Sequence, residues 1–144
     1  MRAPQLERYA YKVRGAGEIM DIKITGVHHI MITVGNIDDA KYFYSSILGF
    51  EEIKIPDYIT GPRLWYKLGP IELHVNEHPK YKAGNSHFAI SVDENKYNEY
   101  ISKIEKTGYE KKSTCEKYDD GYYRLYIHDP FNNCIEIISA STNA

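Results

Sequence analysis

The sequence is poor in the features that mark membrane-spanning, secreted and nucleic-acid-binding proteins. It has two cysteines among 144 residues, too few for a disulfide framework. It has no apolar run near the roughly eighteen residues of a transmembrane helix, and its first residues lack the apolar centre of a signal peptide. A formal net charge of −2 without a basic stripe argues against nucleic acid as a partner. We therefore expect a cytoplasmic protein that binds neither membrane nor nucleic acid.

What is present suits one compact globular domain. A chain of 144 residues, 42% of them hydrophobic, is long enough to bury a core without covalent cross-links. Residues 1–20 show no clean periodicity, and we interpret them as an N-terminal extension. Regular patterning begins at Ile22, so residues 21–144 are predicted to form the single domain.

An internal repeat divides that domain into two modules, at about residues 22–78 and 84–140. Each module opens with a histidine on an alternating strand, "HIMITV" or "HFAISV". A helical pattern follows, over 37–48 in one module and 95–107 in the other, with Gly49 and Gly108 placed to end the helices. Each module closes on strands of which the last contains a glutamate. The sequence thus predicts an α+β fold of two βαβββ modules, with helices outside a cupped mixed sheet.

Four metal-ligating side chains are predicted on the polar faces of these strands. Strand alternation places one apolar face against the helices, and the opposite faces carry His29, Glu72, His87 and Glu136. A buried carboxylate needs a partner. If the four faces line one concavity, a divalent cation satisfies all four side chains. Two imidazoles and two carboxylates suit Mn, Fe(II), Co, Ni or Zn with open coordination positions.

Simpler readings exist for each residue taken alone. A strand histidine is commonly a hydrogen-bonded scaffold group, and a strand glutamate can simply face solvent. The recurrence of both residue types in the two modules favours the metal site. Further residues on the polar faces are candidate substrate contacts, although either arginine could instead form a rim salt bridge: His74, Arg63, Trp65, Arg124 and Tyr126. We interpret Cys134 as a space-filling thiol and His128 as a loop or strand-end residue.

The segments "HHIMITVGNIDDAKYFYSSILGF", "IELHVN", "SHFAISVD" and "DPFNNCIEII" resemble the vicinal oxygen chelate superfamily. That group includes glyoxalase I, fosfomycin-resistance transferases, extradiol dioxygenases and bleomycin-binding proteins. The resemblance covers about residues 22–140. It implies paired βαβββ modules around one divalent metal ion, with ligands at positions that match His29, Glu72, His87 and Glu136. A subset that matches His29, His87 and Glu136 serves the dioxygenases and the fosfomycin transferases.

The resemblance also implies a class of reaction. It favours a metal-dependent lyase or isomerase of the glyoxalase type, acting on a small substrate with adjacent oxygens, with Glu136 or Glu72 moving a proton between neighbouring carbons. Thr33 stands where glyoxalase I commonly has an arginine for glutathione, so the thiol substrate is in doubt. The alternatives are an extradiol-type dioxygenase and a non-catalytic antibiotic-binding resistance protein. By the same resemblance we expect a homodimer whose subunits share the active sites.

Overall fold

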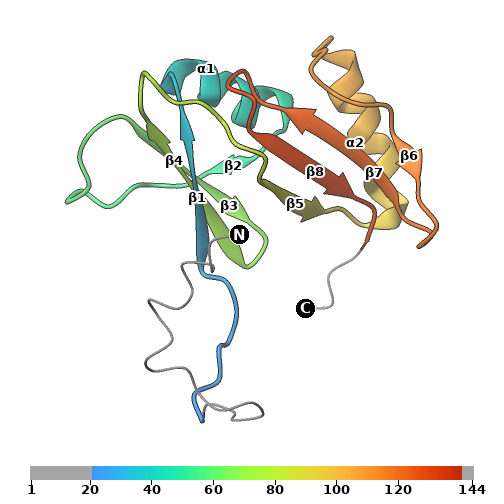
Figure 1. Cartoon of the computed structure of the whole chain (residues 1–144), viewed down its shortest axis with the longest axis horizontal. Helices are drawn as coiled ribbons and strands as arrows, with labels where there is room; N and C mark the ends of the chain where they lie inside the picture. The colour runs from blue at the N-terminus through green and yellow to red at the C-terminus, as the bar shows by residue number, and fades with distance from the viewer. Residues whose placement is uncertain (1–20, 141–144) are drawn as a thin grey trace, which may run out of the picture.

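The computed structural model describes residues 21–140 as two four-stranded mixed sheets, one for each module (Figure 1). The predicted extension at residues 1–20 lies outside this range. The first sheet has the order β1-β4-β3-β2 and the second β5-β8-β7-β6, so each module repeats one topology. The strands of the first sheet are β1 (His29–Val34), β2 (Glu51–Glu52), β3 (Arg63–Leu68) and β4 (Ile71–Glu77). Those of the second are β5 (His87–Ser91), β6 (Glu116–Lys117), β7 (Tyr123–His128) and β8 (Cys134–Ile138). The predicted α+β class and the two-module fold are confirmed.

The first helical segment differs from the uniform helix predicted over 37–48. Helix α1 (Ile37–Lys41) begins at Asn36, whose side chain accepts a hydrogen bond from the Asp39 N–H at 3.0 Å. It continues as the π-helical turn η2 (Tyr42–Ile47). The wider turn accommodates two adjacent aromatic rings, Phe43 and Tyr44, that are both fully buried. The spacing of apolar residues in the sequence does not distinguish such a turn from an α-helix.

The second helix, α2 (Glu94–Lys106), matches the predicted range within one residue at each end. Both helical segments end where the sequence predicts. Gly49 has φ +68° and Gly108 has φ +75°, the left-handed conformation that glycine adopts at no steric cost. None of the helices within residues 21–140 is long and apolar enough to span a bilayer.

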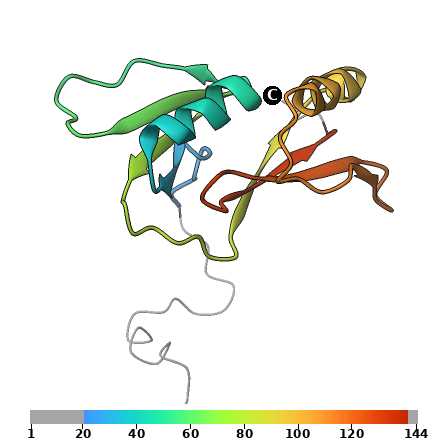
Figure 2. The ribbon, with the colours of Figure 1, turned by 90° about the horizontal axis from the view of Figure 1, so that it is seen from above.

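The core lies between the helices and the apolar faces of the strands. Figure 2 shows each module with its own helix beside its own sheet. The core side chains from β4 and β8 are fully buried and alternate with polar-face residues along each strand: Leu73, Val75, Ile135 and Ile137. The predicted division of these strands into an apolar and a polar face is therefore confirmed. The polar faces of β1 and β5 are largely exposed in the single chain, where both strands are sheet edges.

A buried polar clasp joins the two modules, and we define it as Tyr44, Asp129 and Asn133. Asp129 lies in the turn between β7 and β8 and is completely buried. Its Oδ2 accepts hydrogen bonds from the Tyr44 hydroxyl and from Asn133 Nδ2, both at 2.8 Å. The same Asn133 amide donates to the carbonyl of Thr33 in β1 at 2.8 Å. Burial and the Asp129 carboxylate raise the pKa of Tyr44, so its hydroxyl stays a donor.

Candidate functional site

The first module places its metal-type residues beside an aromatic stack. His29 on β1 lies directly across from Glu72 on β4, in parallel register. The Glu72 carboxylate does not pair with His29. It lies 2.8 Å from His74 Nε2, and this hydrogen bond lowers the pKa of Glu72. His29 Nδ1 meets His28 Nδ1 at 2.9 Å, which leaves Nε2 of His29 as its remaining ring nitrogen for a ligand.

His74 is sandwiched between two rings. The indole of Trp65 on β3 stacks on one side with ring centres 3.7 Å apart, and His29 stacks on the other at 4.2 Å. The His74 side chain is therefore only 12% exposed. The predicted substrate contacts His74 and Trp65 share this stack, whereas Arg63 donates to Asn76 and to the Thr60 carbonyl at the end of β3. The stack gives the polar face of this module a rigid aromatic wall.

The second module brings its metal-type residues into direct contact. His87 Nε2 on β5 lies 3.2 Å from Glu136 Oε2 on β8. The Glu136 side chain is 11% exposed and that of His87 is 46% exposed. The ring of Tyr126 on β7 meets the His87 ring edge to face, with centres 5.9 Å apart. An imidazole nitrogen and a carboxylate oxygen therefore face each other at the open surface of the sheet.

Arg124 on β7 connects Glu136 to the preceding turn. Its Nε donates to Glu136 Oε1 at 2.8 Å, and its two terminal nitrogens donate to both carboxylate oxygens of Asp120 at 2.9 and 2.6 Å. The Tyr118 ring covers the guanidinium at 4.7 Å. The hydrogen bonds from Arg124 lower the pKa of Asp120 to about 2. Arg124, predicted to contact substrate, thus lies between two carboxylates of its own chain.

The Asp120–Arg124 pair gives a testable titration. The Asp120 carboxyl is expected to titrate near pH 2 rather than near its ordinary 3.8, measured by the pH dependence of its ¹³C chemical shift. Because the folded pKa lies below the unfolded one, the stabilisation is present above about pH 4 and is lost as the pH falls towards 2. Arg124→Gln should return the midpoint towards 3.8, while the charge-matched control Lys117→Gln should not. A midpoint near 3.8 in the unaltered chain would contradict this assignment.

One chain does not bring the two halves of the predicted site together. Among residues 21–140, no group of three or more His, Cys, Asp or Glu side chains is placed to hold one metal ion. His29 and Glu72 belong to the first sheet, and His87 and Glu136 belong to the second. Within the described residues, a single chain therefore does not bring the four predicted ligands together. Each module carries one imidazole and one carboxylate on an exposed face.

The two modules also differ in strand register. Glu72 lies across from His29, but Glu136 lies across from Ala89, and the residue across from His87 is Cys134. Relative to the histidine of its own module, Glu136 is therefore offset by two residues from the position that Glu72 occupies. Since side chains alternate with a period of two, the shift leaves both carboxylates on the polar face.

Sequence reasoning passed over several residues that build this region. Asp120 holds Arg124 from a turn, and nothing in its local pattern separates it from the neighbouring Asp119. His128 is the last residue of β7, as interpreted, but its position across from Cys134 on the polar face of the second sheet was not predicted. Lys111, before β6, donates to the Asp129 carbonyl. Register and tertiary contacts, which the sequence does not encode locally, were needed to find all three.

Comparison with known proteins identifies the family of the chain. The family model for the Glyoxalase/Bleomycin resistance protein/Dioxygenase superfamily matches residues 26–137. The chain belongs to this superfamily. The match spans both modules, from before β1 to the end of the glutamate-bearing strand β8. No match was found among curated proteins.

Solved structures of the superfamily share the fold. A glyoxalase family protein from Bacillus anthracis is 30% identical, with a TM-score of 0.71 over 83% of this chain and 98% of that one. Lactoylglutathione lyase from Agrobacterium tumefaciens is 20% identical, with a TM-score of 0.65 over 81% and 94%. The fosfomycin resistance protein FosX from Listeria monocytogenes is also 20% identical, with a TM-score of 0.67 over 83% and 96%. The last two show the shared fold and do not assign a reaction.

Proposed function

We propose that this superfamily member is a divalent-metal-dependent enzyme of the lyase or isomerase type, acting on a small substrate with adjacent oxygens. The observation that carries the proposal is the contact between His87 Nε2 and Glu136 Oε2 on an open sheet face. His29 and Glu72 supply the same two residue types on the other module. A structure of FosX is described as a complex with Mn(II) and 1S,2S-dihydroxypropylphosphonic acid, which supports a divalent ion in this fold.

The donor set fits such an ion. Two ligands bound at about 2.0–2.2 Å to one metal lie roughly 3 Å apart, and the His87 and Glu136 atoms are 3.2 Å apart. The second carboxylate oxygen of Glu136 stays on Arg124, which would fix the orientation of the ligand. Imidazole nitrogen and carboxylate oxygen are ligands that suit Mn, Fe(II), Co, Ni or Zn. A bound ion would stabilise negative charge on two adjacent substrate oxygens.

Side chains of this chain supply the proton-transfer group and a wall of the proposed site. Glu136 is the less exposed of the two glutamates, and we assign it the proton transfer between neighbouring substrate carbons, with Glu72 as the alternative. Arg124 positions Glu136 from one side. The stack of Trp65 on His74 forms a flat wall for a planar or conjugated substrate.

We further propose that two chains complete each site. Strands β1 and β5 are unpaired edges of their sheets, and their polar-face residues are largely exposed. An exposed strand edge of five or six residues is commonly covered in a native assembly. A second copy that covers these edges would bring His29 and Glu72 of one chain towards His87 and Glu136 of the other.

Complementation between differently tagged chains tests the shared site. One chain carries His29→Ala with Glu72→Gln, and the other carries His87→Ala with Glu136→Gln. Shared sites leave one of two sites intact in the purified heterodimer, so its metal content should be about half that of the unaltered dimer. Each double variant alone should bind none. A heterodimer without metal, or a monomer by light scattering at micromolar concentration, would contradict the shared arrangement.

A specific observation also favours a second candidate, a ligand-binding protein without metal. Glu136 already accepts from His87 and Arg124. No buried side-chain nitrogen or oxygen within residues 21–140 lacks a hydrogen-bond partner. Among the described residues, the buried polar side-chain atoms are therefore satisfied without a cation. Absence of metal from protein purified without chelator, together with binding of a planar ligand to the Trp65 wall, would support this candidate instead.

A further inference from the structure

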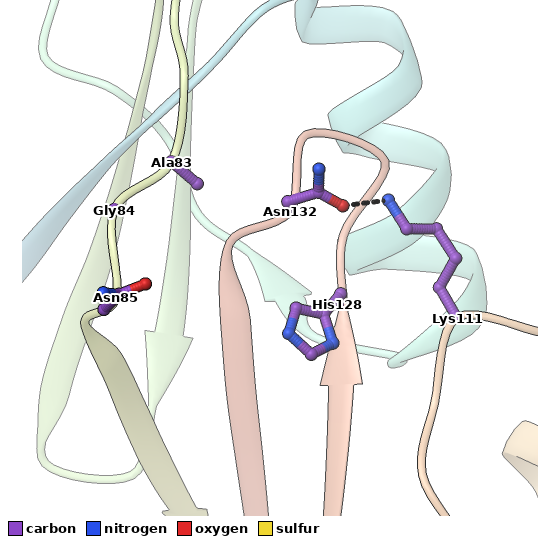
Figure 3. Close-up of a pocket in the computed structure, with 6 residues that line it drawn as sticks. All are labelled: Ala83, Gly84, Asn85, Lys111, His128 and Asn132. Carbon is purple, nitrogen blue, oxygen red and sulfur yellow. Dashed lines mark hydrogen bonds between the residues drawn. The ribbon is translucent and has the colours of Figure 1, made fainter.

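The segment between β4 and β5 links the two modules. An open hollow lies between this linker on one side and the end of β7, with the turn that follows it, on the other. It has a volume of about 550 Å³. Figure 3 shows linker residues along one side and the β7–β8 turn with Lys111 along the other. Six residues line it: Ala83, Gly84, Asn85, Lys111, His128 and Asn132. None of the residues predicted to hold metal or substrate is among them.

The ammonium group of Lys111 is held in a fixed position at this hollow. Its Nζ donates to the Asp129 carbonyl at 2.9 Å and to Asn132 Oδ1 at 2.6 Å. An ammonium has three N–H donors, so these two bonds leave one for a ligand. The bonds also restrict the lysine rotamers before any ligand arrives, which lowers the entropy cost of binding.

The lining offers hydrogen-bond donors and positive charge without a carboxylate. Lys111 supplies a charge, His128 an imidazole, and Asn85 and Asn132 side-chain amides. The nearest acidic residue in the turn, Asp129, is completely buried in the clasp. Its carboxylate accepts from Tyr44 and Asn133 and from the Phe131 N–H. The negative charge of Asp129 is therefore stabilised by hydrogen bonds within the clasp and its turn.

The hollow adjoins the face that carries the proposed active site. His128 lies across from Cys134, which lies across from His87, in one row over three strands. Two strand spacings separate the ends of this row, so the His87 and His128 backbones are about 10 Å apart. If one end of a small-molecule ligand reacts at His87, its opposite end would lie at His128.

We infer that this hollow binds an oxyanion, a carboxylate or a phosphate, of a small-molecule ligand. Lys111 supplies the charge-assisted hydrogen bond, and the Asn132 and Asn85 amides and the His128 imidazole complete the donor set. The inference deepens the proposed function, on which its link to substrate rests: the substrate of the polar face would carry an anionic group about 10 Å from its reacting atoms. The binding of the anion itself is independent of any metal.

Titration of metal-free protein with inorganic phosphate, and separately with acetate, tests the inference. Amide resonances of Gly84, Asn85 and Asn132 in ¹H–¹⁵N spectra should shift and saturate with at least one of the two anions. Saturation by phosphate alone or by acetate alone identifies the class of the anionic group. Lys111→Gln, which keeps a donor for the turn, should weaken binding about tenfold. The charge-matched control is Lys106→Gln, at the exposed end of α2, and it should bind like the unaltered chain.

Gly84→Leu provides a second variant that changes no charge. A Cβ at Gly84 meets no atom within 4 Å, so a leucine side chain would start in open space, and it should reduce anion binding by narrowing the hollow. If Lys111→Gln disturbs the fold, Gly84→Leu still tests whether the hollow binds an anion. Shifts spread over many exposed lysines and equal in both lysine variants would overturn the inference. Loss of metal binding with intact anion binding would instead count against the proposed reaction alone.

Discussion

Replacing Asp129 with alanine is expected to lower the free energy of unfolding by about 4 kcal/mol or more. Asp129 is completely buried and accepts four hydrogen bonds, from the Tyr44 hydroxyl, the Asn133 side chain, and the N–H groups of Phe131 and Asn133. Alanine leaves these donors without an acceptor in the core, and each unsatisfied donor costs about 1–3 kcal/mol. The change also removes one of the hydrogen bonds that join the two modules, since Tyr44 and Asp129 belong to different halves of the chain.

Urea unfolding at one fixed protein concentration measures this effect. The matched control is Asp57→Ala: Asp57 is 94% exposed and pairs at 3.7 Å with Lys54, which is 84% exposed, so a change within about 0.5 kcal/mol is expected. Tyr44→Phe removes one of the four donors and should cost about 1 kcal/mol. Equal stability of the Asp129 and Asp57 variants would show that the clasp does not hold the modules together.

Replacing Glu136 with glutamine is expected to weaken binding of a divalent ion by about 100-fold or more. The neutral amide removes a carboxylate ligand while it preserves the shape of the side chain beside Arg124. His87→Gln should weaken binding to a similar degree, because it removes the nitrogen that lies 3.2 Å from the carboxylate. Competition with a chromophoric chelator, using nickel or zinc, measures the affinity.

Two matched variants separate ligand loss from general effects of charge and histidine content. Glu105→Gln removes a carboxylate from the exposed face of α2. His78→Gln removes an imidazole from an exposed position just after β4. Both should bind the ion like the unaltered chain. If His78→Gln weakens binding as strongly as His87→Gln, the ion lies outside the polar face, and the proposed chemistry loses its foundation.

The features that follow local rules were predictable from the sequence. Alternation along "IELHV" and "CIEII" placed the apolar residues in the core, because a half-buried strand requires that pattern. Gly49 and Gly108 ended the helices for a stereochemical reason that acts at single residues. The repeat of a histidine-bearing strand, a helix and a glutamate-bearing strand was sufficient to predict both modules.

The features that depend on contacts between distant segments were not predictable. The bidentate pair of Arg124 with Asp120 follows from the shape of the β6–β7 turn, which the letters "YDDGYYR" do not specify. The fixed position of Lys111 depends on a turn eighteen residues later. The separation of the two half-sites follows from the absence of pairing between β1 and β5 among the described strands. A sequence assigns residues to faces, but it does not state which faces meet.

The offset between the two modules bears on how a duplicated unit diverges. A slip by one residue would have placed Glu136 in the hydrophobic core and exposed Ile135 and Ile137, which would strongly destabilise the fold. A slip by two keeps every side chain on the same face of the sheet and changes only which residue lies directly across from each histidine, Glu72 in one module and Cys134 in the other. A two-residue offset of this kind changes the ligand geometry of one module relative to the other and leaves the hydrophobic core unchanged.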